Sequence, residues 1–200
     1  NMLAMNGGRP IQMGLKDVIS AFCEFRKEVV TRRTIYLLGK ARDRAHVLAG
    51  LMVALASIDE IIEQIKKAPD TETARNELCS REWPARDVAA FISLIDDPGH
   101  EVIDGKYRLS ETQARAILDL RLQRLTGMER DKLAEETKEL AEKIADYLDI
   151  LGSATRVDQV VLSELAAARE RLDDPRRTEI SDQLADQDDE DLIQQEDMVV

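Results

Sequence analysis

The sequence is poor in the residues that cross-link a chain or turn it sharply. Cysteine occurs twice, as Cys23 and Cys79, and neither lies in a C-x-x-C pair, so we expect no structural disulfide and a cytosolic protein. Nine glycines and five prolines are too few for the turns of an all-β fold. Apolar runs are only a few residues long, so we expect no transmembrane helix and no membrane partner.

Aromatic residues are also scarce, at 4% of the 200 residues, whereas charged residues reach 34% and hydrophobic residues 44%. This composition is typical of long helices that pack side by side. The sequence shows no signal peptide, begins at Asn1 and ends on the apolar residues Met198, Val199 and Val200. We therefore interpret it as a piece cut from a longer protein.

The net charge of −12 is distributed unevenly along the chain. Residues 181–200 carry eight acids and no base, which predicts that residues 175–200 form a disordered acidic linker. Residues 26–44 carry an excess of positive charge. Two interpretations of this charge are open: the bases contact phosphate groups, or they pair with acids of a neighbouring helix. The basic residues of this segment are Arg26, Lys27, Arg32, Arg33, Lys40, Arg42 and Arg44.

Apolar residues at steps of three and four predict two long helical runs. The first covers residues 15–68 and the second covers residues 129–174, with a break at Gly152 and Ser153. Both approach the heptad pattern of a coiled coil. Because no proline or glycine cluster interrupts the second half of the first run, we expect it to be a single outgoing helix.

Short elements are predicted elsewhere. Residues 1–14, rich in glycine, predict an entry loop, and residues 69–128 predict a compact knob between the two helical runs. Four elements are predicted in this knob: a helix over 71–79, a helix over 84–95, a β-hairpin that turns at Asp104-Gly105, and a helix over 111–126 that opens with a capping box at Ser110 and closes at Gly127.

These elements predict a mainly α fold. Its simplest form is a long antiparallel two-helix coiled coil with a small, mostly helical globular knob at its tip. The alternative is a compact helical bundle that folds back on itself.

The predicted helix over residues 111–126 is apolar on more than one face. A knob of this size covers one such face well, so we expect the other to meet a second copy of the chain. The alternative is a helix that is entirely internal. The residues assigned to the dimer interface are Ala114, Ile117, Leu118, Leu120, Arg121 and Leu125.

No catalytic or metal-binding motif is present in the sequence. His46 and His100 lie far apart in the chain without neighbours at zinc-ligand spacing, so we interpret each as an ordinary histidine. The residues alone therefore favour a scaffold or dimer-forming rod, with no catalytic or metal site of its own.

Several stretches together resemble a known family over nearly the whole chain. They are NGGRP (6–10), EVVTRRTI (28–35), KARDRAH (40–46), ALASIDE (54–60), LSETQARAILDLRLQRLTG (109–127), DPRRTEI (174–180), EDLI (190–193) and EDMVV (196–200). The chain resembles the family of the A subunit of bacterial DNA gyrase, a type IIA DNA topoisomerase. Residues 81–106 match that family only loosely.

The resemblance implies a part of an enzyme that supercoils DNA in an ATP-dependent reaction by passing one duplex through another. The matching part is the coiled coil and knob that form the exit gate, or C-gate. The family's nucleophilic tyrosine lies upstream, so the resemblance implies no catalytic residue here, and magnesium and ATP belong to the partner subunit. It also implies a homodimer, the gyrase B subunit and double-stranded DNA as partners, and the bacterial cytoplasm, at the nucleoid, as location.

Two other interpretations remain open. The A subunit of topoisomerase IV is the nearest relative with a similar sequence pattern. A coiled-coil dimerisation scaffold with no DNA role is a different class, in which residues 26–44 pair only with acids. Catalysis by the chain itself is disfavoured, because no catalytic constellation is present.

Overall fold

The structure is a computed structural model that describes residues 2–95, 97, 99–120, 127–178 and 180. The chain is 72% helical, which confirms the prediction of a mainly α fold. It forms two compact units, Asn1–Ser163 and Glu164–Val200. The acidic segment 181–200, predicted as a linker, lies outside the described residues.

The N-terminal segment is a β-hairpin, so the prediction of a loop over residues 1–14 is wrong. Strands β1 (Met2–Asn6) and β2 (Arg9–Met13) pair antiparallel, with Asn6 opposite Arg9. The two turn residues are Gly7 and Gly8, at φ +58° and +78°. Two successive positive φ values define the tight turn that matches the twist of a hairpin, and glycine adopts them without strain.

Helix α1 (Leu15–Ala56) is the longest element of unit 1. Its start is fixed by Asp17, whose carboxylate accepts a hydrogen bond of 3.1 Å from the Gly14 N–H. The helix ends at Ala56, and α2 (Ile58–Lys67) leaves at a bend of 91°. The expectation of one helix over residues 15–68 is therefore wrong at Ser57.

The sequence around Ser57 contains no helix breaker, so we attribute this bend to the packing of the residues that follow it. Ser57 is buried and has left the helical region of backbone space, at φ −122° and ψ 34°. The bend lets Ile61 enter the core, where its side chain is 1% exposed. Removing a large aliphatic side chain from water contributes roughly 1.5–3 kcal/mol.

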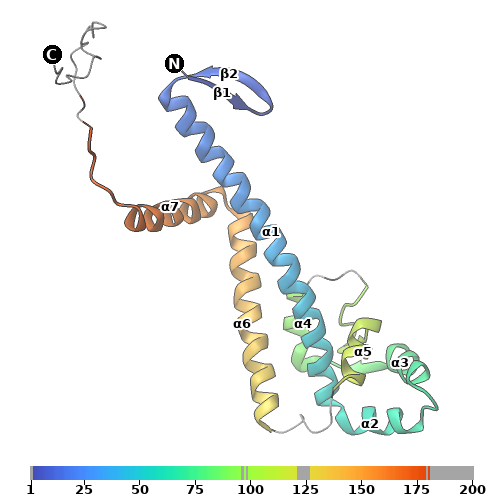
Figure 1. Ribbon diagram of the computed structural model, residues 1–200. Helices are drawn as coiled ribbons and strands as arrows, with labels where there is room; N and C mark the ends of the chain where they lie inside the picture. Colours follow the sequence, from blue (N-terminus) through green and yellow to red (C-terminus); the bar gives the residue numbers. More distant parts are fainter. Residues whose placement is uncertain (1, 96, 98, 121–126, 179, 181–200) are drawn as a thin grey trace, which may run out of the picture. The chain divides into compact units, whose positions relative to one another are not determined.

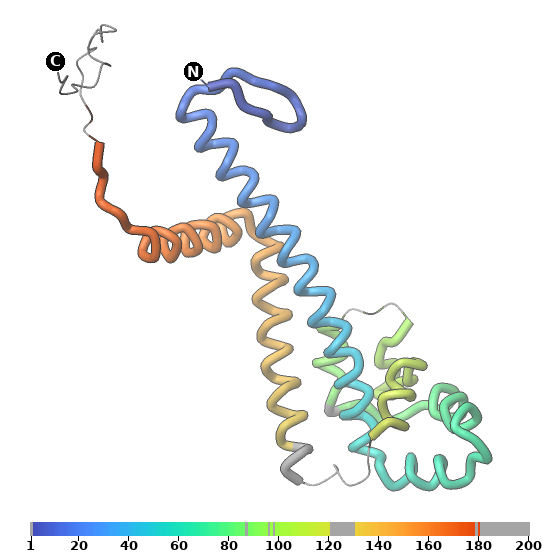
Figure 2. The backbone as a smooth tube through the Cα atoms, in the orientation of Figure 1, coloured from blue at the N-terminus to red at the C-terminus, as the bar shows by residue number. Residues whose placement is uncertain are grey.

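Helix α6 (Gly127–Gly152) runs antiparallel to α1 and lies beside it (Figures 1 and 2). The order of the contacts gives the direction: Arg44 meets Glu136, whereas Val30, nearer the start of α1, shares a buried cluster with Ile150. Helix α7 (Ala154–Arg171) follows a break at Ser153, as the sequence predicts. Its residues Val157 and Val161 complete the cluster around Val30.

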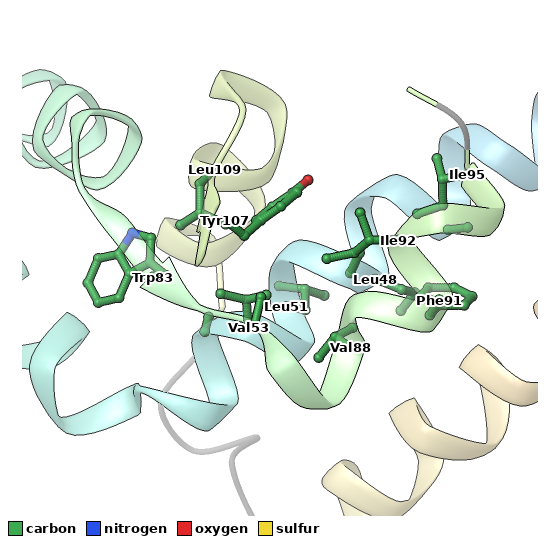
Figure 3. Close-up of a cluster of buried hydrophobic side chains, with 14 of the residues drawn as sticks. Leu48, Leu51, Val53, Trp83, Val88, Phe91, Ile92, Ile95, Tyr107 and Leu109 are labelled. Atoms are coloured by element: carbon green, nitrogen blue, oxygen red, sulfur yellow. The ribbon is translucent and has the colours of Figure 1, made fainter. Parts of the chain in front are cut away.

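Short elements pack against the second half of α1 and form the main core of unit 1. They are α3 (Thr71–Ser80), β3 (Glu82–Pro84), the 3-10 helix η1 (Arg86–Val88), α4 (Ala89–Ile95), β4 (Lys106–Arg108) and α5 (Glu111–Leu118). Figure 3 shows Leu48 of α1 among side chains of α4, with Trp83 and Tyr107 from the two strands nearby.

Two predictions for this region need correction. Residues 84–95 form the end of β3, then η1 and then α4, so they are not one helix. The Asp104-Gly105 turn is present, with φ values of +53° and +75° and a bridge between Ile103 and Lys106. Strand β4, however, pairs with β3, so the ladder joins segments more than twenty residues apart.

The capping box at the start of α5 is confirmed. The Ser110 hydroxyl accepts from the Gln113 N–H at 3.2 Å, and the Gln113 side chain accepts from the Ser110 N–H at 2.9 Å. The helix ends at Leu118, earlier than the predicted residue 126. Residues 121–126 lie outside the described residues, and Gly127 begins α6 instead of closing α5.

Among the described residues, no single helix is long and apolar enough to cross a membrane, and only α1 and α2 taken together, across their bend, reach the length and composition of a span.

Candidate functional site

Some basic side chains of α1 join it to other helices, whereas others interact within α1. Lys27 lies 3.1 Å from Asp158 of α7, and Arg44 donates two hydrogen bonds to Glu136 of α6, at 2.7 and 3.0 Å. These contacts confirm that part of the basic segment pairs with acids of the returning helices. The Asp158 contact raises the pKa of Lys27, and the Glu136 contact raises the pKa of Arg44.

Two of the other bases have partners on α1 itself. Arg32 pairs with Glu28 one turn before it, and the Lys40 ammonium lies 4.8 Å from the centre of the Tyr36 ring. Exposed ion pairs on one helix contribute only ~0–1 kcal/mol each. The remaining bases, Arg26, Arg33 and Arg42, also have interaction partners.

A further ion-pair cluster connects α6 to α7 and was not found by the sequence analysis. Arg156 contacts Asp146 at 2.9 Å and Asp149 at 3.1 Å, across the break at Ser153. Both hydrogen bonds raise the pKa of the Arg156 guanidinium, that to Asp146 most. The sequence signal that could have predicted these ion pairs is the spacing of two acids and one base around Gly152 and Ser153.

The residues predicted for a dimer interface separate into two groups. Ala114 is 0% exposed and Ile117 is 5% exposed, so both already contribute to the core of their own chain. Leu118 and Leu120 are only partly buried. Arg121 and Leu125 lie outside the described residues.

Leu118 and Leu120 border an apolar groove between α5 and the end of α1 with α2. Its volume is about 160 Å³. The lining residues are Ala54, Leu55, Ile58, Ile61, Ile62, Ile65, Lys66, Ile117, Leu118 and Leu120. The contribution of α2 was not predicted from the sequence, because apolar steps of three and four place these isoleucines on the seam of one continuous helix.

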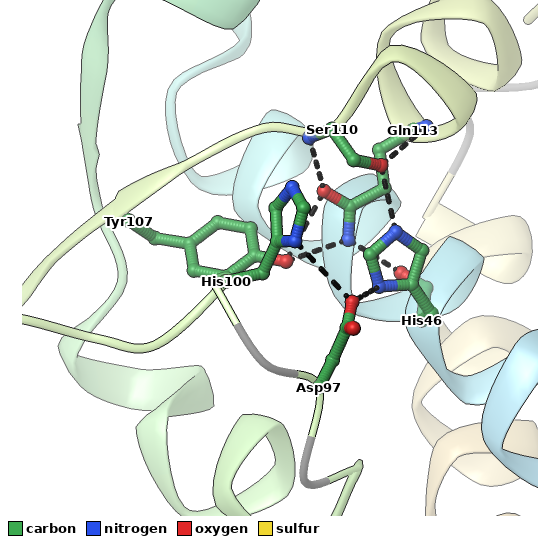
Figure 4. Close-up of polar contacts among 6 residues, drawn as sticks. All are labelled: His46, Asp97, His100, Tyr107, Ser110 and Gln113. Carbon is green, nitrogen blue, oxygen red and sulfur yellow. Dashed lines mark hydrogen bonds and ion pairs between the residues drawn. The ribbon is translucent and has the colours of Figure 1, made fainter.

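A polar cluster joins α1 to the segment before β4 and to α5 (Figure 4). The Nδ1 atoms of His46 and His100 lie 3.0 and 3.3 Å from the same Asp97 oxygen, and the two rings meet edge to face at 5.4 Å. The two histidines, far apart in the sequence, therefore meet in the fold. Burial lowers the pKa of His46, an effect that the Asp97 charge opposes and the His100 charge adds to.

His46 also lies 2.7 Å from the Ser110 hydroxyl through Nε2. The order of contacts, Ser110 to His46 to Asp97, matches that of serine hydrolases. The Ser110 oxygen, however, also accepts the N–H of Gln113 and so caps α5. We therefore assign this cluster a structural role in holding α5 and the segment around Asp97 against α1.

The tyrosines occupy different environments. Tyr107 is 1% exposed and exchanges hydrogen bonds with the Gln113 side chain, and burial raises the pKa of its hydroxyl. Tyr147 is half-buried on α6, whereas Tyr36 is exposed on α1. Within the described part of the chain, no group of three or more His, Cys, Asp or Glu side chains is arranged to hold a metal ion.

Comparison with known proteins supplies the family. The model for the A subunit of DNA gyrase/topoisomerase IV matches residues 1–166. The whole chain is 53% identical to the DNA gyrase A subunit of Granulibacter bethesdensis, 50% to that of Rickettsia conorii and 52% to that of Salmonella typhimurium, and it spans 21%, 22% and 24% of their lengths. The chain therefore belongs to the family of DNA gyrase/topoisomerase IV A subunits.

Proposed function

We propose that this chain is the dimerisation and exit-gate region of a DNA gyrase A subunit. The observation that carries the proposal is the similarity of the whole chain to gyrase A subunits, of which it spans about a quarter or less. The parent enzyme is then an ATP-dependent type II topoisomerase that introduces negative supercoils by double-strand passage. This region serves as a gate, and the chemistry takes place elsewhere.

The apolar groove supports a role in dimerisation. The elements that line it, α2 and α5, lie at the end of the α1–α6 pair that is remote from the N-terminal hairpin (Figure 1), so two copies meeting there leave the rest of each helix pair apart. A gate must stay shut while DNA is cut and must also open to release a duplex. A small apolar contact suits both demands better than an extensive one.

The proposed partners follow from this role. They are a second copy of the chain, the gyrase B subunit and the duplex that leaves through the gate, with magnesium and ATP bound on the partner subunit. The acidic chain, with its net charge of −12, repels DNA and so discourages trapping of the released duplex.

Two other functions compete with the exit gate of a gyrase A subunit. The family model covers both gyrase and topoisomerase IV subunits, whereas the three relatives named above are all gyrase subunits. A scaffold with no DNA role is disfavoured by the same similarity.

The first test is the mass of the 200-residue chain by sedimentation equilibrium. We expect a dimer for the wild type, a folded monomer for Leu120→Glu, and a dimer for the control Leu162→Glu, whose side chain is exposed on α7. A charge placed in an apolar contact costs several kcal/mol, which accounts for the difference. A wild-type monomer at micromolar concentration with intact helicity would contradict the proposal.

A second test addresses the gate itself. A disulfide between two copies of Leu120→Cys, introduced in the full-length parent protein, should stop release of the passed duplex, whereas Leu162→Cys should not. Supercoiling that continues unchanged after complete cross-linking would exclude an exit gate at this groove.

A further inference from the structure

The apolar groove between α5 and the end of α1 with α2 has the composition of a small ligand site. Every residue that lines it is aliphatic except Lys66, and its volume is about 160 Å³. Ala54, Ile61 and Ile117 are its buried members, whereas the other lining residues are partly or fully exposed. The groove therefore offers an apolar floor that a ligand can reach from solvent.

The volume of the groove limits the size of its occupant. A cavity of ~150 Å³ with a similar apolar lining holds a single benzene molecule. One aromatic ring or one branched aliphatic group therefore fills the groove, whereas a helix with its side chains, about 10 Å across, is too wide to enter it. Covering this apolar surface removes it from water, which favours binding of a small apolar group.

Lys66 adds a positive charge to the edge of the groove. Its side chain is exposed, and among the described residues it forms no ion pair. The neighbouring Lys67, in contrast, lies 3.6 Å from Glu63 and does not line the groove. An ammonium without an acidic partner binds a carboxylate through charge-assisted hydrogen bonds. The complementary ligand therefore joins a small apolar body to an anionic head.

We propose that the groove binds small amphiphilic carboxylates, with the apolar body between α2 and α5 and the carboxylate at Lys66. The proposed gate uses the same groove for the contact with a second copy, so a bound ligand competes with dimerisation. This competition rests on the proposed function, whereas the binding itself does not. A ligand of this class then regulates the gate by reducing the fraction of closed dimer.

The probe is phenylbutyrate, which carries one aromatic ring and one carboxylate on a flexible linker. Its matched partners are phenylbutanol and phenylbutylamine, which keep the ring and replace the anion by a neutral group or a cation. Butyrate keeps the anion and lacks the ring. Binding of each to the 200-residue chain is measured by ligand-observed NMR titration. We expect phenylbutyrate to bind with a dissociation constant of order 1 mM or below, at least about fivefold more tightly than the other three.

Charge-reversal variants locate the carboxylate. Lys66→Glu should weaken phenylbutyrate by about fivefold or more and should favour phenylbutylamine, because the new carboxylate repels the acid and attracts the amine. Lys67→Glu is the matched control, since it makes the same change of charge in the same turn of α2 without lining the groove. Lysine and glutamate have similar helix propensities, so circular dichroism should show equal helicity in both variants.

The competition is measured by sedimentation equilibrium. Saturating phenylbutyrate should shift the wild-type dimer towards a monomer with unchanged helicity. The same concentration should leave the mass of Lys66→Glu nearly unchanged, which separates occupation of the groove from a general effect of the amphiphile. A wild-type dimer that keeps its mass at saturation would overturn the competition.

Three results would overturn the binding site. They are no binding of phenylbutyrate, equal binding of the acid, the alcohol and the amine, and an equal loss for Lys66→Glu and Lys67→Glu. A wild-type chain that is monomeric without ligand would instead contradict the proposed function, and the NMR titrations would still decide the binding site.

Discussion

Gln113 holds three segments of the chain together through a single buried amide. Its Nε2 donates to the His46 carbonyl at 2.6 Å and to the Tyr107 hydroxyl at 2.8 Å, while its Oε1 accepts from the Ser110 N–H. The side chain is 0% exposed, and satisfying each of its polar atoms avoids the penalty of an unpaired buried group. This arrangement requires α1 and α5 to approach closely, and Gly50 permits it.

Gly50→Ala should destabilise the protein. A Cβ at this position would lie 2.6–2.9 Å from three carbons of Gln113, so α5 must shift. We expect a loss of about 1–2 kcal/mol in the free energy of unfolding, after the gain in helix propensity. Gly39→Ala is the control, since nothing lies within 4 Å of its new Cβ, and it should stabilise by roughly 0.5–1 kcal/mol. Urea unfolding measures both, and equal effects would refute the close approach.

His46 should make stability depend on pH. Burial holds its folded pKa below the ordinary value of 6.5, so the unfolded chain binds this proton more readily. The free energy of unfolding should therefore fall as pH drops from about 6.5 towards the folded pKa. Asp97, Asp43 and His100 are the charged or titratable groups that act on it.

The measurement is urea unfolding at several pH values for the wild type and His46→Gln. Glutamine does not titrate, so the slope between neutral and mildly acidic pH should be smaller in the variant. An identical slope in both proteins would mean that His46 does not control this dependence.

Among the elements, α5 shows how one short helix serves two surfaces. Ala114 and Ile117 are buried in the core of the chain, where Ile117 also lines the groove, while the less buried Leu118 and, just beyond the helix end, Leu120 border the groove. Sequence periodicity recognised an element that is apolar on more than one side. It did not tell which side faces inward, because that depends on where α1 and α2 lie.

Ile117→Glu should unfold the knob instead of producing a folded monomer. Ile117 is 5% exposed within its own chain, and an unpaired buried carboxylate costs several kcal/mol. Circular dichroism and thermal unfolding should show a large loss of stability for Ile117→Glu and only a small one for Leu120→Glu. Similar melting curves for the two variants would contradict this division of α5.

At the scale of the whole molecule, the proposed gate role predicts that the chain by itself neither cleaves nor relaxes DNA. The resemblance implies that the nucleophilic tyrosine lies upstream, and of the described tyrosines Tyr107 is buried, Tyr147 is half-buried and Tyr36 lies against the Lys40 ammonium. A supercoiled-plasmid assay with magnesium and ATP is sufficient. A covalent adduct between this chain and DNA would refute the prediction.

The basic segment of α1 should bind duplex DNA weakly and only at low salt. Lys27 and Arg44 are held by Asp158 and Glu136, which reduces the charge available to phosphates. Few phosphate contacts give a shallow dependence of affinity on salt concentration. Anisotropy of a labelled duplex across a salt series measures this, and tight binding that persists at high salt would exclude it.

Features that arise within a few residues of one another could be predicted from the sequence. Apolar steps of three and four predicted helices where α1 and α6 lie, Gly152 and Ser153 predicted the break before α7, and the Ser110–Gln113 pair predicted the start of α5. The family resemblance, carried by runs of adjacent residues, also needed no structure. Each of these signals is local, because helix periodicity and capping depend on near neighbours.

Features that depend on distant segments became visible only in the folded chain. Ser57 bends the chain because Ile61 is buried there, and β4 forms its ladder with the distant strand β3, while only Ile103 before its turn bridges to it. His46, Asp97 and His100 meet only because α4 packs on α1. In each case burial and pairing across long sequence separations override weak local preferences, and no local pattern records which distant segments will meet.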